Sequence, residues 1–337
     1  MRFYYITLTL FLQTVSLIAQ PADAVKLSPQ QIALIQNQGA AGIQTVFEEL
    51  EIEIQDLPTV EAFALEVSSS QLTSILTSEM ITDITSPVLI ALAEIAISEN
   101  IKVSYAIEYV SAGIAQGLAI ACSKNSLDVL QSIATASEGI GVSAIQFSLD
   151  TDSDIEKVVS AVGSGYLAGT IEASNNIEIN VVSAVEACSD GLIVGTINKT
   201  LKNNVEIYET LASTCEGIAE AAVEASVREQ LDLIKQVTAA SVGAGKSAVE
   251  TADSLSLEID STKKAILKGL KRGIFDSIPG KGNNIRIMIA PQKDINPYEL
   301  IKSIENGINS GGLDAGYIPI IETPFEDDPL VRQVSPI

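Results

Sequence analysis

Apolar and polar positions recur with a period of 26 residues over the middle of the chain, from about residue 103 to residue 275. Each period has a long stretch with apolar residues at helical spacing, followed by a short polar run such as residues 123–126 or 202–204. One glycine returns in the same phase of every period: Gly113, Gly139, Gly165, Gly191, Gly217, Gly243 and Gly269. This strict spacing predicts a series of equivalent helical units.

Other positions keep the same register. The position ten residues before each glycine is aliphatic, as at Val103, Val129 and Ile155, and the position four residues after it is mostly Gly, Ser or Ala. The position fifteen residues after each glycine holds a residue that suits a helix N-cap or an acid of the first helical turn: Asp128, Asp154, Asn180, Glu206, Asp232, Glu258 and Asn284. Each helix is therefore predicted to begin directly after this polar column.

The number of helices per unit decides the architecture. One straight helix of about 20 residues would rise about 30 Å, and a turn of six residues spans at most about 20 Å. If each unit returns the chain to its starting side, two short helices per unit are needed, with the phased glycine near the bend. The alternative is one long helix per unit, running alternately up and down. Both predict an all-α protein, an α-solenoid of stacked helical hairpins in which each unit packs on its neighbours.

The regions on either side of the repeats differ from them. Residues 25–102 have a degenerate helical pattern that suits a capping section, in which Pro58 and Pro87 are predicted to start helices. Residues 276–337 do not follow the repeat. The repeat unit itself is assigned to residues 103–275.

Three elements are expected in the C-terminal region. Residues 285–290 alternate like a strand. A helix is predicted to begin at Asn296 and Pro297 and to run to about Asn306, with Gly307 as its stop. Residues 317–337 carry four prolines among aliphatic residues and predict an extended tail, a docking arm for the chain itself or for a neighbouring copy.

Residues 1–24 read as a signal peptide, with Arg2, an apolar stretch and a small-x-small ending at Ala24, which predicts an exported protein that is periplasmic, on the cell surface or extracellular. The formal net charge of −23 argues against nucleic acid and anionic membranes as partners. Acids recurring inside the apolar segments argue against stable membrane insertion of the mature chain.

The three cysteines, Cys122, Cys188 and Cys215, lie at different phases of the repeat and are expected to be buried small hydrophobic residues rather than a disulfide framework.

Candidate chemistry is scarce. The chain has no histidine, which removes the usual catalytic triads and zinc sites. Residues 240–247 resemble a phosphate-binding loop and residues 139–144 a dinucleotide fingerprint, but in both the glycines belong to the repeat and no strand precedes them. The acids of residues 150–156 could gather oxygens for calcium; the sequence lacks the glycine and glutamate of an EF-hand loop, so an inter-helix turn is favoured.

The sequence therefore predicts a secreted, non-catalytic structural or protein-interaction protein of the helical-repeat type, one that binds a protein partner or copies of itself and could self-assemble. No residue is assigned as catalytic, cofactor-binding or metal-binding, and no cofactor is expected. The alternative hypothesis is an extracytoplasmic ligand-binding or enzymatic module with its working part in residues 276–337.

Overall fold

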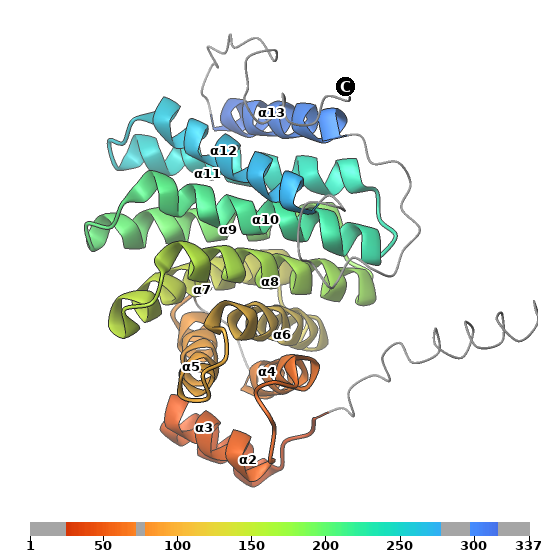
Figure 1. Ribbon diagram of the computed structural model, residues 1–337. Coiled ribbons are helices and arrows are strands. Elements are labelled where there is room, and N and C mark those ends of the chain that lie inside the picture. The colour runs from red at the N-terminus through yellow and green to blue at the C-terminus, as the bar shows by residue number, and fades with distance from the viewer. Residues whose placement is uncertain (1–24, 72–77, 278–296, 316–337) are drawn as a thin grey trace, which may run out of the picture.

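A computed structural model describes residues 25–71, 78–277 and 297–315, and these residues form an all-α protein of twelve helices without a strand (Figure 1). The first four helices precede the regular repeats: α2 (Pro29–Gln38), α3 (Ala40–Glu49), α4 (Leu57–Gln71) and α5 (Ser78–Ser98). The next seven carry them: α6 (Val103–Lys124), α7 (Val129–Thr151), α8 (Ile155–Asn176), α9 (Val181–Lys202), α10 (Ile207–Arg228), α11 (Leu233–Ser254) and α12 (Ile259–Ser277). The last is α13 (Pro297–Asp314).

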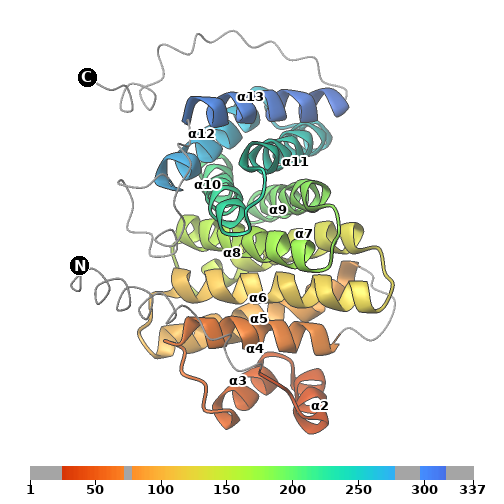
Figure 2. The same ribbon diagram turned by 90° about the vertical axis from the view of Figure 1, so that its right-hand side faces the viewer.

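Each repeat is one long helix, so the preferred prediction of two short helices per unit was wrong and its alternative is correct. A repeat consists of a helix of 22 or 23 residues in α6 to α11, followed by a turn of a few residues. Consecutive helices run in opposite directions, as Figure 2 shows for the middle of the chain. The chain thus returns to its starting side after two repeats, and a return within one repeat is not needed.

The turns are built alike. A residue with left-handed backbone conformation follows each helix from α5 to α11 at the same phase: Asn100, Ser126, Asp152, Glu178, Asn204, Gln230 and Ser256. The next residue then donates its N–H back to the helix, as Leu127 does to the carbonyl of Cys122 at 2.9 Å, which is the bond of a Schellman motif. One residue later the next N-cap follows, and Asp128 accepts from the N–H of Gln131 at 3.1 Å.

The predicted N-cap column is confirmed at five positions where the side chain accepts a backbone N–H: Asp128, Asp154, Asn180, Glu206 and Asp232. Local sequence alone explains these helix starts, because a short polar side chain satisfies an N–H group that the helix leaves without a partner.

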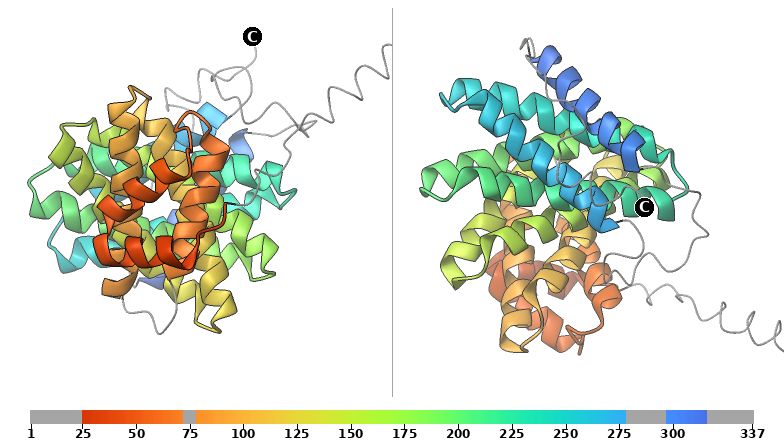
Figure 3. Two further views of the ribbon diagram at one scale, coloured as in Figure 1. Left: turned by 90° about the horizontal axis from the view of Figure 1, so that it is seen from below. Right: turned by 45° about the horizontal axis from the view of Figure 1, so that its top comes forward.

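From α4 onward each helix packs most closely on the next helix but one, whereas α2 and α3 pack chiefly on each other. The even-numbered helices α4, α6, α8, α10 and α12 form one stack, and the odd-numbered helices α3, α5, α7, α9, α11 and α13 form a second stack beside it. Figure 1 shows this layering from α2 and α3 at the bottom to α12 and α13 at the top, and the view from below shows that successive helices are rotated about the stacking direction (Figure 3).

The phased glycines lie where helices of one stack touch. A Cβ at Gly165 of α8 would stand 1.9 Å from the carbonyl oxygen of Glu108 on α6, and a Cβ at Gly217 of α10 would stand 1.9 Å from the carbonyl oxygen of Ser160 on α8. The predicted bend at the glycine was therefore wrong. The residue is needed at mid-helix because it lets two parallel backbones approach within a distance that any side chain would block.

A second column of small residues faces these glycines. In α6 to α11 the position two residues before the phased glycine is always small: Ser111, Ser137, Gly163, Ser189, Cys215 and Ser241. A Cβ at Gly269 would lie 2.8 Å from the Cβ of Cys215, and one at Gly307 would lie 2.5 Å from the Cβ of Ser241. In α12 the corresponding residue is Leu267, and in α13, counted from Gly307, it is Glu305. These larger side chains mark α12 and α13 as the last layers of the two stacks.

Two further predictions need correction. Pro87 lies inside α5 rather than at its start, although Pro58 stands at the second position of α4 as expected. The C-terminal helix begins at Pro297 as predicted but continues to Asp314. Gly307 does not stop it, because this glycine makes the same close contact, with Thr238 and Ser241 of α11, that the phased glycines make.

The predicted signal peptide (1–24), the strand at 285–290, the cap at Asn284 and the tail at 317–337 all lie outside the described residues.

Candidate functional site

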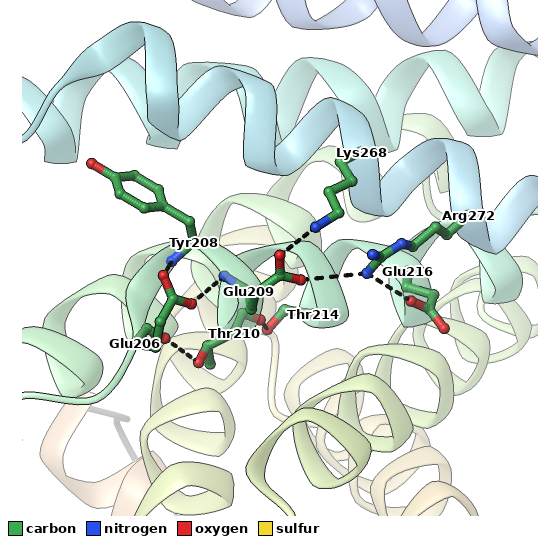
Figure 4. A network of polar contacts seen from close by, with 8 residues as sticks. All are labelled: Glu206, Tyr208, Glu209, Thr210, Thr214, Glu216, Lys268 and Arg272. Carbon is green, nitrogen blue, oxygen red and sulfur yellow. Dashed lines mark hydrogen bonds and ion pairs between the residues drawn. The ribbon is translucent and has the colours of Figure 1, made fainter. Parts of the chain in front are cut away.

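A cluster of polar side chains joins α10 to α12 (Figure 4). The Glu209 carboxylate accepts a hydrogen bond from the Lys268 ammonium and lies 3.6 Å from the Arg272 guanidinium, which in turn lies 4.0 Å from the Glu216 carboxylate. The hydrogen bond from Lys268 holds the pKa of Glu209 below its usual value. With side chains about 40% exposed, such as Lys268 at 42% and Glu209 at 43%, each pair contributes at most about 1 kcal/mol.

Two carboxyl groups at this cluster, Glu216 on α10 and Asp276 on α12, have raised pKa values. Burial raises the pKa of Glu216, and the negative charges of Asp276 and Glu156 add to this, against the opposing effect of Arg272. Burial likewise raises the pKa of Asp276. Perturbed carboxyl groups attract attention as acids or bases. Here Arg272 lies near both carboxyl groups and lowers the pKa of each. An ion-pair network that joins α10 to α12 explains the arrangement as well as an acid or a base would.

A polar ladder crosses the even stack. The Gln116 amide on α6 donates to Glu61 on α4 at 2.8 Å and to Glu172 on α8 at 3.3 Å. The Arg228 guanidinium on α10 then donates to Glu172 at 3.2 Å. These hydrogen bonds join four successive helices of the even stack, α4, α6, α8 and α10.

The segment that resembles a phosphate-binding loop, residues 240–247, lies in the middle of α11. A Cβ at Gly243 would stand 2.2 Å from the carbonyl oxygen of Glu186, and one at Gly245 would stand 2.7 Å from that of Ile308. The Ser247 hydroxyl donates to the Gly243 carbonyl at 2.9 Å. Backbone of neighbouring helices thus fills the space that phosphates would need. Residues 139–144 lie in the middle of α7 in the same way.

The acidic segment 150–156 forms the turn between α7 and α8. Asp152 has the left-handed conformation, while Asp154 caps α8 and pairs with Lys157 at 2.5 Å. The described part of the chain contains no group of three or more His, Cys, Asp or Glu side chains placed to hold a metal ion.

The three cysteines are free and buried. Burial raises the pKa of all three thiols, that of Cys188 to about 12. A thiol with a raised pKa and no access to solvent is a poor nucleophile, so these residues act as small core side chains.

One surface feature escaped the sequence patterns. Most of the exposed large hydrophobic side chains lie at the C-terminal ends of the odd helices, one from each of five successive layers: Ile97, Leu149, Leu201, Leu255 and Leu313. We call these five residues the edge row. The first three stand 52 residues apart, two repeats each, and a period of 52 was not sought in the sequence. At the equivalent position of the even helices α6 and α8 stand Ser123 and Asn175.

Two helices, α6 and α9, are long and apolar enough to cross a membrane by length and composition. Their apolar windows are 72% and 56% buried among other helices, as core helices of a soluble protein also are.

Comparison of the chain with protein-family models and with curated proteins found no match. The argument for function therefore rests on the chain's own geometry.

Proposed function

We propose that the protein is an exported α-solenoid scaffold without catalytic activity, whose long two-stack surface binds a protein partner. The observation that supports this most directly is the regular packing of one helix per repeat on the next helix but one. An array of this kind builds an extended surface from equivalent positions of successive layers, and such surfaces serve binding.

The polar groups of the described residues favour the same proposal. The ion pairs between α10 and α12 and the ladder from Glu61 to Arg228 join neighbouring layers to one another. Among the described residues, five of the eight exposed large hydrophobic side chains form the edge row. Exposed apolar side chains in a row are typical of contact surfaces.

Self-assembly by simple continuation of the stacks receives less support. A further copy that repeated the internal packing on α12 or α13 would place a glycine against Leu267 or Glu305, where the inner layers offer a small residue. We therefore propose a monomer that engages a different protein.

The alternative, a ligand-binding or enzymatic module in residues 276–337, is not favoured by the described part of that region. Helix α13 packs on α11 through Gly307 and Gly311, with a Cβ at Gly311 standing 2.2 Å from the carbonyl oxygen of Val242. It is thus one more layer of the odd stack.

The first test is light scattering after size exclusion on the chain from Val25, with and without calcium, where we expect a monomer under both conditions. Immobilised chain would then capture its partner from the extracytoplasmic fraction of the source cells. The captured protein should be lost with Leu149→Ser and Leu201→Ser and kept with Ile234→Ser, a matched control that lies at the opposite edge and is 44% exposed. Ordered polymers, or capture that ignores the edge variants, would contradict the proposal.

A further inference from the structure

We propose that the partner binds the edge row with a cationic amphipathic surface, in which Lys or Arg side chains flank apolar residues. This inference rests on the proposed function, because it names the chemistry of the partner that the row binds. Three observations support it: the turns that adjoin the row, the acids in these turns, and the ion pairs of the opposite edge.

Four members of the edge row lie beside the turns that lead from an odd helix to the next even helix. Each stands within three residues of the left-handed residue of such a turn: Ile97, Leu149, Leu201 and Leu255. In Figure 1 the turns from α9 to α10 and from α11 to α12 lie on the left of the stacks. The side chains of these turns therefore surround the exposed apolar groups that a partner contacts.

Two of the turns are strongly acidic. Residues 150–157, which follow Leu149, contain four acids and one base. Residues 250–260, which include Leu255, contain four acids and no base. The apolar side chains of α7 and α11 at this edge thus stand in surroundings of net negative charge.

The acids of these two turns are all exposed, and few of them are neutralised. Asp154 pairs with Lys157 at 2.5 Å. Asp152, Glu250 and Asp253 have no basic side chain within ion-pair distance in the described part of the chain. Their charges are therefore left for a molecule outside the protein to balance.

The opposite edge differs, because its charges are largely balanced within the protein. In the turn from α10 to α11, Arg228 lies 3.5 Å from Glu229, and Lys235 lies 3.3 Å from Asp232. These pairs flank Ile234, an exposed apolar residue of that edge. Exposed apolar groups beside unpaired acids are thus a feature of the row and not of every turn.

This combination selects the chemistry of the partner. Apolar residues at the centre of an interface supply most of the affinity, while charges around them speed association and exclude partners of like charge. Each exposed ion pair adds up to about fivefold in affinity. A partner with Lys or Arg beside its apolar residues gains from the acids, whereas an acidic protein or an anionic lipid surface is repelled by them.

The turn from α9 to α10 makes the expectation more specific. Lys199 and Lys202 lie beside Leu201, and the Lys199 ammonium donates to the Gln146 side chain. The cations of the partner are therefore expected beside Leu149 and Leu255 rather than beside Leu201.

The test measures how the protein binds a synthetic amphipathic helix of leucine and lysine, about five turns long, by fluorescence anisotropy. The edge variant is Asp152→Asn with Asp253→Asn. The matched control is Asp128→Asn with Glu178→Gln, which removes the same charge from exposed turn positions of the opposite edge. Asp152 and Glu178 both have the left-handed conformation, and asparagine caps a helix as well as aspartate does, so both variants are expected to fold.

We expect the edge variant to bind the helix about tenfold more weakly than the unchanged protein at about 0.05 M salt, and the control variant to bind it unchanged. The difference should disappear at about 0.5 M salt, where the screening length is about 4 Å. Equal weakening by the two variants would mean that the helix responds only to the net charge of the chain, which would overturn the proposal. Equally tight binding of a helix of leucine and glutamate would overturn it as well.

The partner that the immobilised protein captures gives a second readout, which separates this inference from the proposed function. Its capture should fall with the edge variant and with added salt. Capture that depends on Leu149 and Leu201 but not on Asp152 and Asp253 would refute the cationic chemistry and leave the binding role of the row in place. Capture that ignores the leucines as well would refute the proposed function itself.

Discussion

The contact at Gly217 offers the sharpest test of how the stacks are held together. A Cβ at this position would stand 1.9 Å from the carbonyl oxygen of Ser160 and 2.8 Å from the amide nitrogen of Ser164, both on α8. Ordinary contact begins at 3.4 Å, so Gly217→Ala must move α10 away from α8 by about 1.5 Å. The obstacle is helix backbone, which cannot turn aside as a flexible side chain can.

The expected cost can be estimated from two opposing effects. Overpacking of this kind costs typically 1–3 kcal/mol, and we take about 3 kcal/mol because the gap opens along two packed helices. Alanine in place of glycine inside a helix stabilises the helix by about 1 kcal/mol, because alanine has the higher helix propensity. Gly217→Ala should therefore lower the free energy of unfolding by about 2 kcal/mol.

Gly312→Ala is the matched control. A Cβ at Gly312 of α13 would meet only side-chain atoms at 3.5 and 3.6 Å, so the helix preference of alanine is unopposed and should stabilise by about 0.5–1 kcal/mol. Urea unfolding followed by circular dichroism measures both variants. If Gly217→Ala stabilised the protein as much as Gly312→Ala does, the account of the glycines as close-contact residues would be wrong.

Four other outcomes follow from the turns, the acids and the thiols. Glu178→Gly should raise the free energy of unfolding by about 0.5–1 kcal/mol, because Glu178 has a φ of 58° and glycine adopts this left-handed conformation without strain; a loss of stability in urea would contradict the Schellman assignment. Asp232→Ala should cost about 1 kcal/mol in the same assay, since the Asp232 side chain accepts the N–H of Lys235 at 3.2 Å. The raised pKa of Glu216 means that the stability this carboxyl group provides is present below its ordinary value of 4.5 and is lost as the pH rises through the raised value. Glu216→Gln should thus be relatively more stable at pH 7 than at pH 4 when compared with the unchanged chain, and a difference that does not vary with pH would refute this. Finally, a thiol reagent should leave Cys188 unmodified in the native protein and label it after unfolding, because its pKa is raised to about 12 by burial; rapid labelling of the folded chain would show that the core around it opens.

Much of the fold could be predicted from local pattern. Polar residues such as Asp128 begin helices wherever they occur at the right phase, because capping depends on neighbours within one turn. The all-α character follows from apolar residues at helical spacing. The edge row was accessible in principle as a period of 52 at Ile97, Leu149 and Leu201, but an exposed leucine and a buried one look alike in a sequence.

The errors came from residues whose role depends on distant partners. A glycine ends a helix in one setting and admits a neighbouring helix in another, and Gly165 and Gly307 are of the second kind. The turns were difficult to recognise for the opposite reason. Their left-handed positions hold Asn, Ser, Asp, Glu or Gln, so the residue that most often marks such a turn is missing from all of them.

The sequence by itself determined the 26-residue period, the helical character of each unit and the start of most repeat helices, because these depend on contacts within a few residues. Only the tertiary structure decided that each unit is one helix, that it packs on the next unit but one, and that the phased glycines of α8 to α12 face a backbone 57 positions earlier in the chain. The physical reason is that helix pairing is set by the fit of two surfaces from distant parts of the chain, and a repeat in which all units are alike does not reveal which units meet.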